Sequence, residues 1–232
     1  MKMHSIFKIV GVFQKTKSSL KTELFRKVTM LYKAGTLYKT RTGYIAVAML
    51  ALALCFSHFF NPIASYAAAD FSDVPYGAWY RSDVMSAVEM GLVNGTSATT
   101  FSTEQDISFF EVYKLAACMY QFSTTGKVTL QVGAGAWYKT YLNYALEHGI
   151  LDTKNGYAYY ERIGDSKTAR GSFMKIFSKA LPAGKLRAIN EIEDGVIPDV
   201  STDYVYRDPI YQLYRAGILS GVDEQGSCNA MH

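Results

Sequence analysis

The chain has little cysteine and lacks the short motifs that carry most enzyme chemistry. Three cysteines among 232 residues are too few for a small scaffold held together by disulfides. The sequence contains no histidine-rich metal spacing, no nucleophile elbow and no phosphate-binding loop. Hydrophobic residues make up 49% of it, which is enough to bury the core of one or two domains and excludes wholesale disorder.

The excess of positive charge is confined to the start of the chain. The whole sequence has a net charge of +4, but residues 1–43 hold ten basic residues and one acid, Glu23. Residues 70–232 therefore have 14 basic and 19 acidic residues, a net charge of −5. Because no basic surplus remains there, we expect no nucleic-acid partner.

Residues 1–69 are typical of an export signal with a long basic leader. An uncharged apolar run covers residues 44–60, and the alanines at 67–69 offer a small-residue cleavage site. Two alternatives stay open: an uncleaved anchor, since the run approaches the ~18 residues of a spanning helix, and a start at Met30. Both place the later residues outside the cytoplasm. We expect a secreted protein that meets the membrane only through this segment, before cleavage.

The remaining sequence contains one pattern three times. It reads FSDVPYGAWYRSDVMSAVEMGLVNG at 71–95, TLQVGAGAWYKTYLNYALEHGIL at 129–151 and IPDVSTDYVYRDPIYQLYRAGILSG at 197–221. The 12-residue interval from tryptophan to glycine, or from valine to glycine in the third copy, is identical. We therefore predict three units of one kind, at 70–126, 127–182 and 197–232, the third truncated, with a linker at 183–196.

Each unit is predicted to begin with a short helix that ends at a glycine. Val84, Ala87 and Val88 follow the spacing of a helix that buries one face, and Gly91 suits the left-handed residue after its end. In the third unit, Asp208-Pro209 predicts an N-cap followed by proline at the first helical position.

A second helix is predicted in the first two units. Ser108 and Glu111 have the spacing of a capping box and are predicted to be structural caps. In the second unit, an apolar stripe runs up to Pro182, which stops the helix. The fold class is thus mainly α: three pseudo-symmetric helix–loop–helix repeats in a compact bundle, after an N-terminal hydrophobic helix.

This pattern resembles the S-layer homology domain of bacterial surface proteins. The first unit carries the matching residues: Phe71, Asp73, Val74, Pro75, Trp79, Tyr80, Ala87, Gly91, Leu92, Val93, Gly95, Phe101, Ile107, Ser108 and Glu111. The resemblance implies a helical bundle of three units. It also implies non-covalent attachment to anionic secondary cell-wall polysaccharide, often pyruvylated, in grooves between units.

The resemblance implies an anion-binding arginine at the start of each second helix. This chain has Phe109 there in the first unit and Arg170 in the second. A guanidinium can bind a carboxylate with two hydrogen bonds. Arg170 is therefore the candidate residue for the polysaccharide, and we expect at most one complete groove.

Four further residues are candidates for contact with the polysaccharide. Trp79 and Trp137 suit stacking on a sugar ring, with a core position as the alternative. Gly95 and Thr96 suit the rim of a groove, with a plain turn as the alternative.

We expect a non-catalytic anchoring module at the cell wall or cell surface of a bacterium. Its expected partner is secondary cell-wall polysaccharide, with self-association in a surface layer, and no cofactor or metal. The alternative is a wall-associated glycoside hydrolase or its surface-display fragment, which needs two facing carboxylates. Glu89, Glu111 and Glu161 are available, but each has a capping or solvent-face explanation. A disulfide between Cys118 and Cys228 stays open.

Overall fold

The computed structural model describes residues 70–221, 223 and 225–229. The predicted export signal lies outside them. This part of the chain forms six α-helices and no β-strand, so the mainly α prediction is confirmed for it. No helix within it is long and apolar enough to cross a membrane.

Three nine-residue helices stand where the first helix of each unit is predicted. They are α3 (Arg81–Glu89), α5 (Lys139–Glu147) and α8 (Arg207–Arg215). Gly91, Gly149 and Gly217 follow them with φ values of 71°, 67° and 66°. A residue with a Cβ is strained in this left-handed conformation. Glycine therefore recurs two residues after the end of each of these helices.

The N-cap prediction for the third unit is wrong. α8 begins at Arg207 with Tyr206 as its N-cap, so Asp208 already lies in the first turn. Its carboxylate accepts a hydrogen bond from Arg207 Nη1 at 3.0 Å and caps no backbone group. The backbone turn from Tyr204 to Arg207, closed by a 2.9 Å hydrogen bond, starts the helix earlier than the proline signal indicates.

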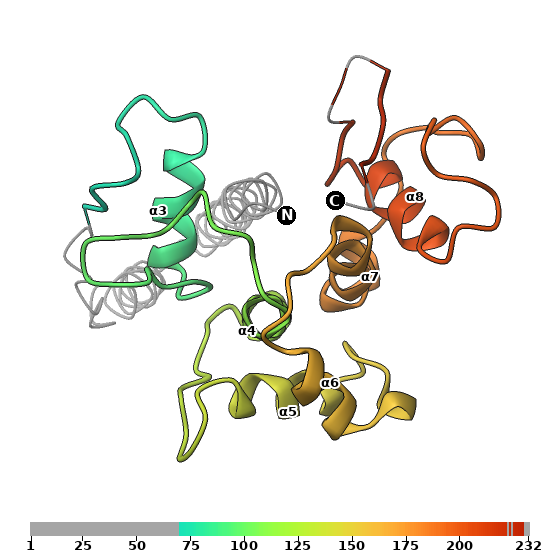
Figure 1. Cartoon of the computed structure of the whole chain (residues 1–232). Coiled ribbons are helices and arrows are strands. Elements are labelled where there is room, and N and C mark those ends of the chain that lie inside the picture. Colours follow the sequence, from blue (N-terminus) through green and yellow to red (C-terminus); the bar gives the residue numbers. More distant parts are fainter. Residues whose placement is uncertain (1–69, 222, 224, 230–232) are drawn as a thin grey trace, which may run out of the picture. The chain divides into compact units, whose positions relative to one another are not determined.

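Two longer helices lie side by side, and two of the shorter helices pack against them. α4 (Phe109–Thr125) contacts α7 (Arg170–Ala180), α5 packs against α4, and α8 packs against α7 (Figure 1). Burial of α4 extends around most of its circumference, and its fully buried positions are Phe110, Val112, Tyr113, Leu115, Ala116, Ala117, Cys118 and Met119. α6 (Tyr157–Ile163) and the 3-10 turns η2 (Thr153–Asn155) and η3 (Ala183–Lys185) complete the set.

The predicted capping box at the start of α4 is confirmed. Ser108 Oγ accepts a hydrogen bond from the Glu111 backbone N–H at 3.3 Å, and Glu111 Oε2 accepts one from the Ser108 backbone N–H at 2.7 Å. Two donors that the helix itself cannot satisfy are therefore paired.

Replacing the cap should destabilise the protein measurably. For Ser108→Ala we expect a loss of about 1 kcal/mol of unfolding free energy, because one helix N–H loses its acceptor. Urea denaturation checks this. Ser178→Ala, which alters a hydroxyl bonded to the Lys175 carbonyl within α7, is the control and should change stability much less. A Ser108→Ala midpoint equal to that of the wild type contradicts the role of the cap.

The loops of the first and third predicted units close in the same way. The Asp73 carboxylate accepts hydrogen bonds from the backbone N–H groups of Phe101 and Ser102 at 2.8 and 2.5 Å. Asp199 accepts from Cys228 and Asn229, both at 2.6 Å. Ser102 and Asn229 share a positive φ, 67° and 52°. The chain therefore repeats one loop geometry up to Asn229.

The segment predicted as a linker, 183–196, is folded against α8. The backbone N–H groups of Ile189 and Asn190 donate to the Arg215 carbonyl at 2.8 and 2.9 Å. The Arg215 side chain in turn donates to the Ile192 carbonyl at 2.8 Å and to Asp194 at 2.7 Å. The two backbone bonds satisfy the last carbonyl of α8, and the two side-chain bonds hold the segment against the helix.

Both described cysteines are free and buried, so the disulfide that the sequence left open is not formed. Burial raises the pKa of the Cys118 thiol to about 12. Cys228 Sγ lies 3.6 Å from Met174 Sδ. Both residues behave as small apolar side chains of the core.

Phe110 joins the first predicted unit to the second. Its ring stacks on that of Tyr138 with centroids 3.6 Å apart, and its backbone N–H donates to the Gly164 carbonyl at 2.8 Å. The ring also occupies the space that a Cβ on Gly164 needs. The start of α4 is thereby fixed between α5 and the end of α6.

Candidate functional site

A groove of about 500 Å³ lies where the first predicted unit meets the second. The loop after α3, the first two turns of α4 and the segment before α5 form its walls. We call it the first groove, and its lining residues are Leu92, Val93, Asn94, Gly95, Thr96, Phe101, Ile107, Glu111, Lys114, Leu115, Val132 and Trp137.

Three of the residues predicted to contact the polysaccharide meet in this groove, Gly95, Thr96 and Trp137, together with the predicted cap Glu111. Gly95 packs so closely that a Cβ would stand 2.7 Å from the backbone oxygens of Ser97 and Thr100. Thr96 Oγ1 donates to the Thr100 carbonyl at 3.2 Å. Gly95 and Thr96 therefore form the turn, as the plain interpretation holds, and the same turn is one wall of the groove.

The two tryptophans are surface residues, so the core alternative is wrong. The exposed fraction is 39% for Trp137 and 57% for Trp79. Trp137 is held by edge-on contacts to Phe110 and Tyr138, with ring centroids 6.1 Å away in each case. Trp79 packs edge-on against Tyr80 and is not among the residues that line the first groove. Of the two tryptophans, Trp137 is the one that lines the first groove.

Lys114 is the groove residue that sequence reasoning missed. It follows Glu111 by one helical turn and is partly buried, and burial lowers the pKa of its ammonium group. Its Nζ lies 5.6 Å from the centroid of the Tyr141 ring, and it has no ion pair among the described residues. The Glu111 carboxylate, whose charge acts on the pKa of Lys114, accepts the hydrogen bonds of the capping box. Lys114 is therefore a cation available to an anionic ligand.

A second, smaller groove of about 90 Å³ occupies the corresponding place between the second and third predicted units. It is lined by Phe109, Tyr113, Ile150, Leu151, Asp152, Asn155, Tyr159, Tyr160, Ile163, Ser172, Lys175, Ile176, Lys179 and Tyr206. Lys175 follows Ser172 as Lys114 follows Glu111, three residues later. The two grooves thus share a lysine at the same helical step.

Arg170, like Trp79, lies outside the two described grooves. It is the first residue of α7 and is absent from the lining of both grooves. Burial raises the pKa of the Cys228 thiol and of the Tyr214 hydroxyl. The positive charge of the Arg170 guanidinium opposes this rise at both groups. Arg170 therefore lies against the third unit, and its role in binding stays a prediction.

Of the three carboxylates considered for catalysis, Glu111 and Glu161 have structural partners, and Glu89 is exposed on α3. Glu111 Oε2 accepts from Ser108 at 2.7 and 2.8 Å. Glu161 accepts from the Tyr138 hydroxyl at 2.8 Å, and that bond raises the pKa of Tyr138 to about 12. No group of three or more metal-binding side chains is found in the part of the chain that the structure describes.

Comparison with known proteins finds one family match and one similar protein. Residues 70–112 match the S-layer homology domain family, and this range includes both the Gly95 turn and the start of α4. The chain is also similar to a surface-layer 125 kDa protein of Lysinibacillus sphaericus, with 24% identity over 115 residues. The match covers 48% of this chain and 10% of that protein. No solved structure matches the chain.

Proposed function

We propose that this S-layer homology domain protein anchors itself to the cell surface by holding secondary cell-wall polysaccharide, pyruvylated or otherwise acidic, in the first groove. The family match and the relative support a cell-surface anchoring module. The observation that carries the finer proposal is the pairing of an exposed indole with an available ammonium group: Trp137 and Lys114 line the same groove. An aromatic face suits a sugar ring, and an ammonium suits its carboxylate.

The proposal includes three units and export. Recurring positive-φ glycines after α3, α5 and α8 support a common unit, as do the matching Asp73 and Asp199 loop closures. The alanines at 67–69 support cleavage before Asp70. In this proposal the module is non-catalytic, lies outside the cell and takes part in the assembly of a surface layer.

Sedimentation with isolated cell walls tests the proposed function. The full chain is mixed with walls of the host bacterium, and with the same walls stripped of polysaccharide by hydrofluoric acid. We expect the protein to sediment with intact walls and to stay in solution with stripped ones. Equal sedimentation with both rejects polysaccharide as the ligand. Release of reducing sugar from the walls would instead favour a hydrolase.

Removing the charge of Lys114 should weaken wall binding without harming the fold. Because burial lowers the pKa of this ammonium, the charged form has a cost in the unliganded protein that an anion offsets. For Lys114→Met we therefore expect about fivefold weaker binding and an unchanged or higher melting temperature. Lys139→Met, on the solvent face of α5, should alter neither. A lower melting temperature for Lys114→Met, with binding intact, contradicts the assignment.

A further inference from the structure

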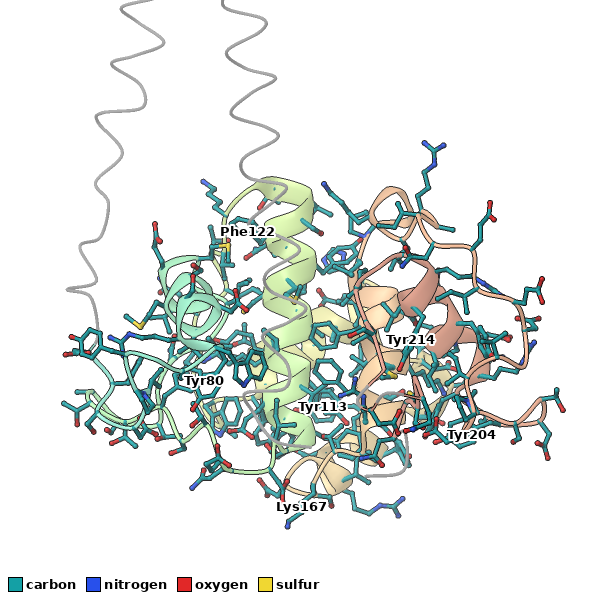
Figure 2. The ribbon with its side chains drawn as sticks, turned by 90° about the horizontal axis from the view of Figure 1, so that it is seen from above. Tyr80, Tyr113, Phe122, Lys167, Tyr204 and Tyr214 are labelled. Carbon is teal, nitrogen blue, oxygen red and sulfur yellow. The ribbon has the colours of Figure 1, made fainter. Side chains whose placement is uncertain are left out.

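Charge is unevenly distributed over the three predicted units. Residues 70–126 include two basic and seven acidic residues, residues 127–182 include eight and four, and residues 183–232 include four and eight. In Figure 2, side chains on the outer loops of the third unit, around the labelled Tyr204, end in red oxygen atoms. Surfaces of opposite charge on one molecule attract those of a second copy, and such complementarity directs association between proteins. The structure shows which of these charges are free to take part.

Three lysines of the second predicted unit lie around one carboxylate. They are Lys154, Lys175 and Lys179, called here the basic cluster, and all three side chains are exposed. A hydrogen bond from the Lys154 backbone N–H at 3.0 Å, together with the charges of the three lysines, lowers the pKa of Asp152. None of the lysines forms an ion pair in the part of the chain that the structure describes. The cluster therefore has three ammonium groups against a single carboxylate.

The basic cluster has an energetic cost in an isolated molecule. Lys175 and Lys179 are four residues apart on α7, and like charges at this spacing repel each other and destabilise a helix. The Tyr206 ring, whose centroid lies 5.8 Å from Lys175 Nζ, offsets part of this cost. An anionic partner removes the repulsion and adds charge-assisted hydrogen bonds. The repulsion therefore favours the bound state of the cluster.

Segment 189–196 of the third predicted unit exposes apolar and acidic side chains together. The exposed fraction is 75% for Ile189 and 60% for Val196. Glu191 and Glu193, between them in the chain, are also exposed and form no ion pair among the described residues. We call these four residues the acidic strip.

The composition of the acidic strip favours a basic protein surface as its partner. Apolar side chains within a charged rim are the usual make-up of a protein–protein interface, whereas an acidic wall polymer is repelled by the two carboxylates. Lysine side chains offer both a counter-charge and a methylene stem that packs on apolar residues. The basic cluster has this chemistry.

The acidic strip is held in place at both ends. The Ile189 backbone N–H donates to the Arg215 carbonyl at 2.8 Å, and the Gly195 backbone N–H donates to Tyr211 Oη at 2.8 Å. Between them, the Ile192 carbonyl accepts from Arg215 Nε at 2.8 Å. Little ordering of the segment is then needed on binding, which lowers the entropic cost of association. No ion pair among the described residues joins the strip to the basic cluster, so both are available to another molecule.

We propose that the acidic strip of one copy binds the basic cluster of a second copy. Glu191 and Glu193 pair with the ammonium groups, and the aliphatic side chains of the strip pack on the lysine stems. The exposed ring of Tyr159, which lines the second groove with Lys175 and Lys179, extends this apolar contact. The inference rests on the surface-layer assembly in the proposed function, not on the polysaccharide, and names the contact that builds the layer.

The contact joins copies head to tail. The strip and the cluster are different surfaces, so each copy binds one neighbour through its strip and another through its cluster. Such heterologous contacts build open chains of molecules unless the geometry closes a ring. Copies attached to one wall are held at high local concentration, so a contact that is weak in solution suffices there.

Charge reversal on each side tests the contact. The cluster variant carries Lys175→Glu and Lys179→Glu, and the strip variant carries Glu191→Lys and Glu193→Lys. Sedimentation velocity without cell walls measures the association of the full chain, in a non-ionic detergent that covers the apolar run at 44–60. We expect the wild type to form oligomers as its concentration rises, and each variant alone to associate at least tenfold more weakly. An equimolar mixture of the two variants should associate like the wild type, because both of its contacts again join opposite charges.

Two control variants carry the same changes of charge elsewhere. Lys127→Glu with Lys139→Glu matches the cluster variant, and Glu89→Lys with Glu147→Lys matches the strip variant; all four side chains are exposed. Both controls should associate like the wild type, and mixing them should change nothing. Raising the salt concentration should weaken wild-type association, because exposed charges are screened. Equal losses in variants and controls reject the contact.

Different results reject the contact and the proposed function. If the wild type stays monomeric, or if mixing the two variants does not restore association, the contact is wrong, whatever the result of wall sedimentation. If the cluster variant associates like the wild type but sediments less with walls, the lysines bind the wall polymer and the second copy is rejected. If the wild type does not sediment with walls while mixing restores association, the anchoring proposal is wrong and the contact stands.

Discussion

Gly164→Ala should destabilise the protein by about 3 kcal/mol, the upper part of the range for overpacking a core. Gly164 has ordinary helical dihedral angles, φ −56° and ψ −39°, so alanine meets no backbone strain there and has the better helix propensity. The cost comes from the Phe110 ring, whose atoms are the nearest to the new Cβ and fill its position. Relief requires Phe110 to leave its stack on Tyr138. Chemical denaturation measures the change.

A double-mutant cycle isolates the cause. In a Phe110→Ala background, Gly164→Ala should cost close to nothing, because the obstructing ring is gone. Gly184→Ala is the matched control, since no atom lies within 4 Å of its added Cβ. Equal costs of Gly164→Ala with and without the Phe110 ring contradict this account.

Trp137→Ala should weaken binding to cell walls about 30-fold, equivalent to ~2 kcal/mol for an aromatic group central to a binding site. Trp137 is the aromatic side chain that lines the first groove at its surface, and Phe110 and Tyr138 hold its ring in place. The substitution removes the aromatic face on which a sugar ring stacks and leaves the polar side chains of the groove. Wall sedimentation at several protein concentrations gives the affinity.

Trp79→Ala is the comparison for this prediction. Trp79 has the equivalent position in the first unit and is the more exposed of the two, but it does not line either described groove. We expect its loss to change binding less than threefold. Trp137→Phe, which keeps an aromatic face, should restore part of the affinity. If both alanine variants weaken binding equally, the polymer also follows the surface around Trp79.

Features with a short sequence range were predictable because neighbours along the chain determine them. The capping box joins Ser108 to Glu111 within one turn, and the glycines after α3, α5 and α8 mark a local change of backbone sign. The exception is the start of α8, where the turn before Arg207 overrode the Asp208-Pro209 signal. Two local signals compete there, the Tyr204–Arg207 turn and the Asp208-Pro209 pair, and the sequence pattern does not show which one starts the helix.

Which residues share a groove, in contrast, could not be predicted from the sequence, because they come from segments far apart in the chain. Nothing in the sequence pattern distinguishes Lys114, because a lysine in a helix is ordinarily a solvated residue. Only the packing of α5 against α4 places it in the same groove as Trp137 and gives it partial burial. The same holds for Tyr113, whose unpartnered hydroxyl follows from burial among α4, α6 and α7.

The sequence by itself determined the helical fold class and the capping box of α4, because helical periodicity, capping pairs and glycine positions are local and repeat at fixed intervals. The tertiary structure alone decided which side chains share a groove, which tryptophan faces it, and that lysines rather than Arg170 line both grooves. The physical reason is that a groove is made by segments far apart in the chain, and packing sets the exposure and charge of each.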